Sequence, residues 1–193
     1  MVDPARLEQT STELLQQLIR FNTVNPPGNE AAAQAFIQSL LEEHGFTCET
    51  LAKDPARPNL IATLRAPSGT DGPTVALLTH IDTVLANPDE WQVDPWSGEI
   101  RDGCVWGRGA QDMKGQAAAE IAAVIELLKA GWAPATGQLK VIVTADEEAG
   151  GIYGARWLCA QHPQEVRCAF ALNAGGGNQL SFNGRRYFRV GCA

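Results

Sequence analysis

The segment Thr74–Asp82 reads TVALLTHID, an apolar run that ends in a histidine and an aspartate. A second apolar run, Leu139–Thr144, is followed shortly by the acids Asp146, Glu147 and Glu148. Short apolar runs of this length, rich in β-branched residues, are typical of strands buried in the middle of a sheet. We therefore predict two buried strands, the first of them central and covered on both faces, with polar side chains at the end of each.

Helical and extended patterns alternate around these two runs. Apolar residues at helical spacing predict helices over residues 5–21, 29–44 and 112–130. Further strands are predicted at residues 46–51, 59–64 and 167–172, a short helix around 155–159, and tight turns at Asp102-Gly103 and Asn183-Gly184. Strands that alternate with helices indicate a layered α/β domain.

Composition and charge exclude several classes of protein. The chain has 193 residues, 45% of them apolar, and 15 Lys and Arg stand against 22 Asp and Glu for a formal charge of −7. This composition suits one globular domain. An acidic chain without a basic cluster is a poor partner for nucleic acid or an anionic membrane. With no leader pattern and no long apolar stretch, we expect a soluble, cytoplasmic protein.

The five cysteines are scattered and have no metal-binding or redox spacing. They are Cys48, Cys104, Cys159, Cys168 and Cys192. We expect reduced and mostly buried thiols rather than a disulfide framework.

Four polar clusters follow predicted strands or precede the third helix. His80 and Asp82 are two residues apart, so in an extended segment they point to the same side. This arrangement suits a metal-binding histidine supported by a carboxylate. The alternative is a histidine at a strand end that only forms hydrogen bonds within the protein. The fourth cluster, Leu172–Asn178, contains three glycines and is interpreted as a turn, because Ala174 has no side chain able to bind a ligand.

The second cluster, Gly107–Gly115, places Asp112 directly before the third helix. Asp112 could cap that helix through its carboxylate. The glycines at 107, 109 and 115 permit a closer backbone approach than capping requires, which favours a carboxylate bridging two metal ions. Both interpretations stay open.

The third cluster, Asp146–Glu148, contains three consecutive acids after a buried strand. Adjacent carboxylates repel one another, and a bound cation would neutralise this repulsion. The alternative is a turn whose acids are exposed to water. With a metal as the cation, one carboxylate could bind it while its neighbour acts as a general base. A carboxylate pair for glycoside hydrolysis fits less well, because neighbours on a strand would point to opposite faces.

The remaining histidines and motifs narrow the chemistry. His44 and His162 have simple roles at helix ends, so the ligand set is His80 with carboxylates, which suits zinc, cobalt or manganese. The chain contains no nucleophile elbow, no dinucleotide-binding fingerprint and no phosphate-binding loop.

Three motifs, in this order, carry a resemblance to a known family. They are LLTHIDTV (77–84), VWGRGAQDMKG (105–115) and TADEEAGG (144–151). Together they resemble the dinuclear zinc hydrolases that include aminoacylases, glutamate-releasing carboxypeptidases, acetylornithine deacetylases and succinyl-diaminopimelate desuccinylases. The resemblance covers nearly the whole chain and implies a three-layer α/β/α zinc-peptidase-like domain with a mostly parallel mixed sheet.

The resemblance also implies roles for individual residues. His80 and Glu148 would each bind one of two zinc ions, and Asp112 would bridge them. Asp82 would orient His80, and Glu147 would be the general base of amide hydrolysis.

Two departures from the family pattern set further expectations. The family has an acid at the position of Ala174 that completes the shell of the metal held by His80. It also takes a last histidine from a C-terminal segment that follows a lid and dimerisation domain. We expect residues 1–193 to be the N-terminal part of the catalytic domain, without the lid through which a full-length relative would form a homodimer.

Two functional hypotheses follow. The first is a metal-dependent hydrolase that cleaves an amide bond of an N-acyl amino acid or a small peptide. The second is a catalytically inactive fragment or degenerate domain that binds metal weakly, because Ala174 and the C-terminal ligand are lost.

Overall fold

The computed structural model describes residues 2–174 and 179–188 of the chain. Its centre is a five-stranded sheet in the order β1-β2-β6-β3-β7. The strands are β1 (Thr47–Leu51), β2 (Asn59–Arg65), β3 (Thr74–His80), β6 (Gln138–Thr144) and β7 (Phe170–Asn173). β3 is parallel to β6 and β7, whereas β2 is antiparallel to β1 and β6. Only β2 therefore runs against the other strands of this sheet, which confirms the predicted mostly parallel mixed sheet.

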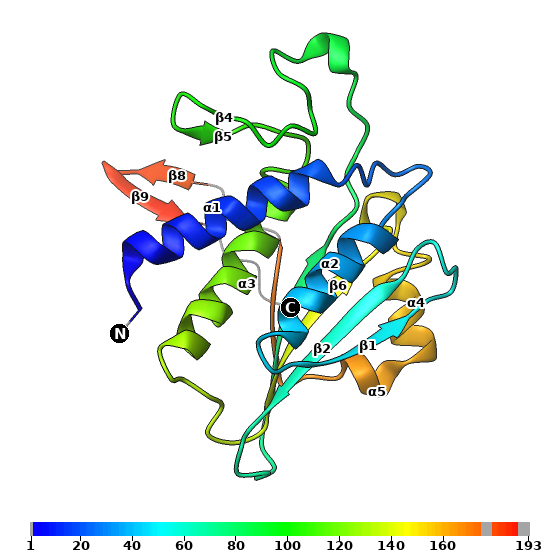
Figure 1. The fold of residues 1–193 in the computed structure, drawn as a ribbon, viewed down its shortest axis with the longest axis vertical. Coiled ribbons are helices and arrows are strands. Elements are labelled where there is room, and N and C mark those ends of the chain that lie inside the picture. The colour runs from blue at the N-terminus through cyan, green and yellow to red at the C-terminus, as the bar shows by residue number, and fades with distance from the viewer. Residues whose placement is uncertain (1, 175–178, 189–193) are drawn as a thin grey trace.

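Helices cover both faces of the sheet (Figure 1). One face carries α1 (Pro4–Arg20), α2 (Ala31–Glu42) and α3 (Lys114–Lys129), and the other carries α4 (Ala155–Gln161) and α5 (Pro163–Val166).

Alternate residues of the inner strands β2, β3 and β6 enter the two cores. Leu60 and Ala62 of β2 pack with α1, α2 and α3, while Ile61 between them packs with Leu158 of α4. This follows from the two-residue side-chain period of a strand. The predicted three-layer α/β/α arrangement is confirmed.

The most deeply buried strand is β6 rather than β3. Every residue of β6 after Gln138 is buried. β3 lies inside the sheet, but its Val75 is 38% exposed, because its outer neighbour β7 is short and exposed along its length. The prediction that β3 is covered on both faces is thus only partly right.

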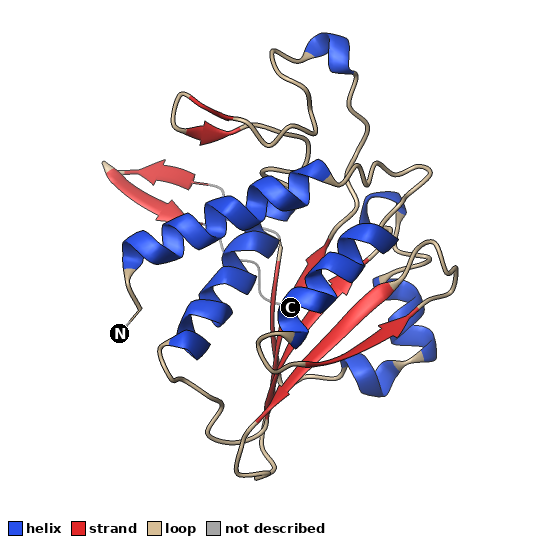
Figure 2. Ribbon diagram, viewed as in Figure 1, coloured by secondary structure: helices blue, strands red, loops and turns tan. Residues whose placement is uncertain are grey.

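A long connection leads from β3 to α3 and extends away from the sheet (Figure 2). It contains the 3-10 turn η1 (Pro88–Glu90) and a hairpin of β4 (Ile100–Arg101) and β5 (Cys104–Val105). Asp102 and Gly103 at its tip have φ angles of 53° and 74°, as a two-residue hairpin turn requires. A second hairpin, β8 (Gln179–Phe182) and β9 (Arg185–Phe188), turns at Asn183 and Gly184. Both predicted turns are confirmed.

The cysteines differ from expectation. Among the described residues Cys104 and Cys159 are exposed, and Cys48 and Cys168 are half-buried. These four thiols form no disulfide within the described residues, and they are not core residues. Cys192 lies outside the described residues. Within the described part of the chain, no helix has both the length and the apolar character needed to cross a membrane.

Candidate metal centre

His80 occupies the last position of β3 and is held by Asp82, two residues further on. Nδ1 of His80 lies 3.1 Å from the backbone oxygen of Asp82 and 3.4 Å from its Oδ1. Both side chains are almost completely buried. These contacts engage Nδ1 and leave Nε2 as the ring nitrogen available to a metal. The two side chains therefore lie on the same side, as their spacing predicts.

Three carboxylates approach Nε2 of His80. Oδ1 of Asp112 lies 3.3 Å from it and Oε2 of Glu147 lies 3.6 Å from it. Donor atoms of His80, Asp112 and Glu148 all lie within 4.8 Å of one another. One nitrogen and several carboxylate oxygens form a donor set that suits zinc, cobalt or manganese. Segments far apart in the sequence thus converge on one group able to hold a metal ion.

The start of α3 explains the position of Asp112. The N-cap of α3 is Met113, and no side chain of the described residues caps this helix, so the capping interpretation of Asp112 is wrong. The Asp112 side chain is 72% exposed and faces His80. Gly109 has a φ of 87°, and a Cβ at Gly115 would collide with the backbone oxygen of Ala110. The tight backbone predicted from these glycines is therefore present.

Lys114 stabilises the start of α3, a role that was not predicted from the sequence. It is fully buried, and its Nζ donates a hydrogen bond to the backbone oxygen of Phe21 at 2.7 Å. Burial lowers the pKa of Lys114 to about 7, with partial compensation from Asp82. Lys114 thereby ties the start of α3 to the end of α1.

The three consecutive acids differ from the expectation in their charge partner and in their secondary structure. Asp146, the first of the three acids, is buried and pairs with a cation of the protein: Nη1 of Arg57 lies 3.0 Å from its Oδ1. Glu147 and Glu148 begin the 3-10 turn η2 (Glu147–Ala149), so they do not point to opposite faces of a strand. The argument against a carboxylate pair from strand geometry therefore does not hold.

Asp82 holds that turn in place. Its Oδ1 accepts a hydrogen bond from the backbone N–H of Glu147 at 3.0 Å, and its Oδ2 accepts one from the N–H of Glu148 at 3.1 Å. Asn25 adds a side-chain hydrogen bond to Oδ2 at 2.8 Å. Asp82 therefore supports both the histidine and the two glutamates.

Asn25 and Arg57 were also not identified as site residues from the sequence. Asn25 belongs to the turn predicted after α1, and Arg57 precedes β2. Three consecutive acids indicate that a cation is needed, but nothing in the sequence points to Arg57 as its source.

Electrostatics favour a protonated His80 in the metal-free protein. Burial opposes the charge, but the hydrogen bond and charge of Asp82 and the charge of Glu147 outweigh it and raise the pKa of His80 to about 9. Burial, reinforced by Asp112 and Glu147, raises the pKa of Glu148 against the opposing effect of His80. The proton of His80 thus offsets part of the negative charge that a metal ion would neutralise.

Metal binding is therefore expected to release about one proton from His80 at pH 7.5. That pH lies below a pKa of about 9, so the free ring is charged, whereas a ligand ring must be neutral. Zinc affinity should rise about tenfold per pH unit between pH 6.5 and 8. Calorimetric titration in buffers of different ionisation enthalpy measures the released proton. His162→Gln, at a distant helix end, is the control, and an affinity independent of pH above 7 would contradict the expectation.

Ala174 directly follows β7, the neighbour of β3. Asn173 pairs with Leu78, so residue 174 is level with Thr79 and close to the end of β3 that carries His80. The sheet therefore brings residue 174 to the edge where the metal-binding group lies. The predicted turn through Gly175–Gly177 lies outside the described residues.

The other two histidines lie at helix ends, as predicted. Nδ1 of His44 lies 2.8 Å from the backbone oxygen of Leu40, and His162 is the C-cap of α4, with its ring near Trp157.

Comparison with known proteins identifies the family. The sequence pattern of peptidase family M20/M25/M40 matches residues 76–186, more than half of the chain. The chain belongs to this family. The match contains the three motifs quoted above and the site residues predicted from the sequence, but not Asn25 or Arg57. The predicted membership of a metallopeptidase family is confirmed.

Curated proteins with similar sequences include succinyl-diaminopimelate desuccinylases. The one from Rhodospirillum centenum is 40% identical over 152 residues, which are 76% of this chain and 39% of that protein. The one from Xanthomonas campestris is 38% identical over 158 residues, 80% of this chain and 40% of that protein. The chain thus spans about two fifths of the length of the relatives it matches.

Solved M20 structures share the fold. A metallo-carboxypeptidase from Sulfolobus solfataricus has a TM-score of 0.74 at 19% identity, covering 86% of this chain and 37% of that one. Human carnosine dipeptidase 1 has a TM-score of 0.72 at 20% identity, covering 87% and 39%. A Bacillus subtilis protein described as a dinuclear metal-binding M20 peptidase has a TM-score of 0.60 at 20% identity, covering 89% and 43%. These similarities support the α/β fold assigned above.

Proposed function

We propose that this protein is a metal-dependent hydrolase that cleaves the amide bond of an N-acyl amino acid or a small peptide. The observation that carries the proposal is the convergence of His80, Asp112 and Glu148, with donor atoms within 4.8 Å of one another, beside the carboxylate of Glu147. Hydrolysis of an amide by water needs a bound metal and, beside it, a carboxylate that is not one of the metal ligands and can accept a proton.

The donor set fits the metal chemistry of the family. His80 and Glu148 would each bind one ion, Asp112 would bridge two, and zinc is the proposed metal, with cobalt or manganese as substitutes. When bound, the ions would polarise the scissile carbonyl and lower the pKa of water.

Glu147 is the proposed general base. Its side chain is 57% exposed and its Oε2 faces Nε2 of His80, so it can reach both solvent and a substrate carbonyl held at the site. It would accept the proton of the attacking water and donate a proton to the leaving amine. Asp82 would act indirectly, by holding the ring of His80 and the backbone of Glu147.

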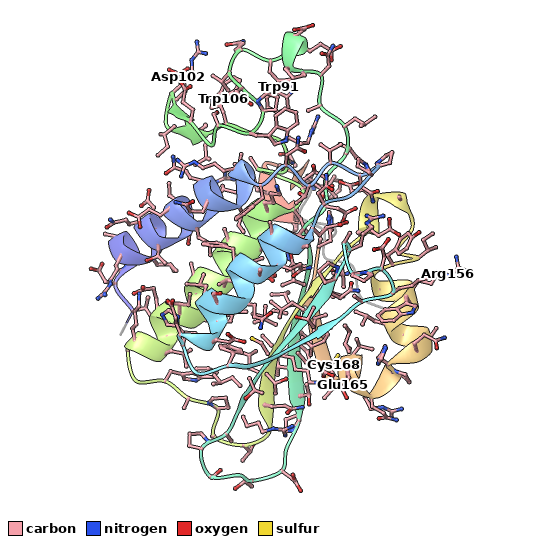
Figure 3. The ribbon with its side chains drawn as sticks, turned by 45° about the vertical axis from the view of Figure 1, so that its right-hand side comes forward. Trp91, Asp102, Trp106, Arg156, Glu165 and Cys168 are labelled. Carbon is pink, nitrogen blue, oxygen red and sulfur yellow. The ribbon has the colours of Figure 1, made fainter. Side chains whose placement is uncertain are left out.

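A cavity of about 770 Å³ beside the metal-binding group could hold the substrate. Its lining includes Glu148 of η2 and, from the long connection between β3 and α3, Asp112, Trp91, Trp106 and Arg108. Figure 3 shows Trp91 and Trp106 on this connection, away from the sheet. The two tryptophans and the cation of Arg108 suit a small acylated amino acid or a short peptide.

The activity is tested by incubating the zinc-loaded protein with acetyl and succinyl amino acids and with dipeptides, and by measuring the released amine. We expect hydrolysis of at least one class, its loss when a chelator removes the metal, and its return when zinc is added. The desuccinylase relatives and the dipeptidase structure make these substrate classes the first to test.

An inactive, metal-binding member of the family is the second candidate. Ala174 favours it, since the resemblance implies an acid at that position. Zinc binding through His80 without hydrolysis of any tested amide would support this candidate over the first.

A further inference from the structure

Asp146, which precedes the two glutamates, has an unusual backbone conformation. Its φ is 64° and its ψ is 21°, in the left-handed region that residues other than glycine seldom occupy. It is almost completely buried. Such a conformation persists only where neighbouring groups hold it, and these groups therefore control the direction in which residues 147 and 148 leave the strand.

Three donors hold the carboxylate of Asp146. Oδ1 forms an ion pair with Nη1 of Arg57 and accepts a hydrogen bond from Nδ2 of Asn25, both at 3.0 Å. Oδ2 accepts one from the backbone N–H of Tyr153 at 3.2 Å. Arg57 is the only charged member of these three, and its guanidinium also lies 4.9 Å from the ring centre of Tyr153.

Arg57 is itself fixed in place. Its Nε and Nη2 lie 3.1 and 2.6 Å from carboxylate oxygens of the fully buried Glu30. A Cβ at Gly28 would collide with the guanidinium, so the loop before α2 packs directly against the Arg57 side chain. Because Glu30 fixes one edge of the guanidinium, the remaining nitrogen presents a charge to Asp146 from a rigid position.

The same network reaches the metal-binding group. Nδ2 of Asn25 contacts Oδ1 of Asp146 and Oδ2 of Asp82, so one amide lies between two buried carboxylates. Without Arg57, these two negative charges would face each other across that single amide, and one would have to move or become protonated. Since Asp82 accepts the N–H groups of Glu147 and Glu148, such a movement would displace both glutamates.

We propose that Arg57, acting through Asp146, is a positioning residue that holds Glu147 and Glu148 toward the metal-binding group. The inference rests on the proposed function for the roles of the two glutamates. Arg57 lies outside the three motifs and does not touch the metal-binding group itself. Its effect is transmitted by the backbone of residues 146–148.

The test measures Co²⁺ binding by the purified chain, from the affinity and from the visible absorption of the bound ion, which reports its ligand geometry. Arg57→Gln is expected to lower the affinity at least about tenfold and to change the spectrum, as loss of outer supporting groups does at metal sites. Arg57→Lys, which keeps the charge, should restore part of the affinity.

Lys53→Gln is the matched control. Lys53 lies over the same Tyr153 ring, at 5.1 Å, but bonds only to the backbone oxygen of Ile152 and not to Asp146. It should bind Co²⁺ as the unchanged chain does. Asp146→Asn is the second variant if Arg57→Gln does not fold, because Arg57 keeps its partner Glu30 there. Because this substitution breaks the ion pair with Arg57 but also removes one of the two facing charges, it should change the spectrum less than Arg57→Gln does.

A double substitution separates positioning from a general loss of structure. If Arg57 acts through the glutamates, Arg57→Gln should cost much less affinity in a Glu148→Gln background than in the unchanged chain. Folded variants with a lower unfolding temperature but unchanged affinity and spectrum would overturn the proposal. Because metal binding is measured, failure to hydrolyse any amide would instead count against the proposed function and leave the role of Arg57 intact.

Discussion

Replacing Glu147 by Gln is expected to reduce amide hydrolysis by about 100- to 10,000-fold, the usual contribution of a general base. Gln has the size of Glu but cannot accept the proton of water. The backbone N–H of residue 147 would still bind Asp82, so the turn should keep its shape. The fall should appear in kcat, with KM little changed, because the substrate contacts remain.

Glu148→Gln is the comparison that separates base from ligand. The two residues are adjacent on η2, and both backbone N–H groups bind Asp82, but only Glu148 joins His80 and Asp112 in the metal-binding group. Glu148→Gln should weaken zinc binding, whereas Glu147→Gln should leave it nearly unchanged. An undiminished kcat in Glu147→Gln protein with full zinc occupancy would exclude Glu147 as the base.

Ala174→Glu is expected to strengthen zinc binding at least about tenfold, a conservative figure because supporting groups alone change metal affinity by that much. The pairing of Asn173 with Leu78 brings residue 174 to the edge of the sheet that carries His80. A carboxylate there would add an oxygen ligand to the ion held by His80. Competition with a chromogenic chelator would measure the affinity.

Asn173→Glu is the matched control for charge. It adds the same carboxylate one residue earlier, and successive residues of a strand point to opposite faces. An affinity that rises equally in both variants would show that general attraction of the cation, and not a ligand at residue 174, accounts for the gain.

Local patterns predicted most of the fold because each depends on neighbours in the sequence. The spacing of leucines predicts the helix α1. The turn at Asp102 and Gly103 is predicted because these residue types tolerate a positive φ. Burial was predicted less well. The coverage of β3 depends on its partners in the sheet, which no local pattern contains.

In the candidate site, too, local patterns predicted some features correctly and others wrongly. The residue types and spacing in the motifs around His80, Asp112 and Glu148 predicted a metal-binding group, and the structure brings these three together. Two local interpretations were wrong. Asp112 does not cap α3, and the acids at 147 and 148 lie on a 3-10 turn rather than a strand.

Residue types at short spacing were enough to predict the order of helices and strands, a candidate set of metal-binding residues and the family. Which group neutralises Asp146 follows from the folded chain alone. Its buried partner is Arg57, from a loop distant in the sequence. The physical reason is that a buried carboxylate is stabilised by whichever cation folding brings within hydrogen-bonding distance, and that distance has no counterpart in the linear sequence.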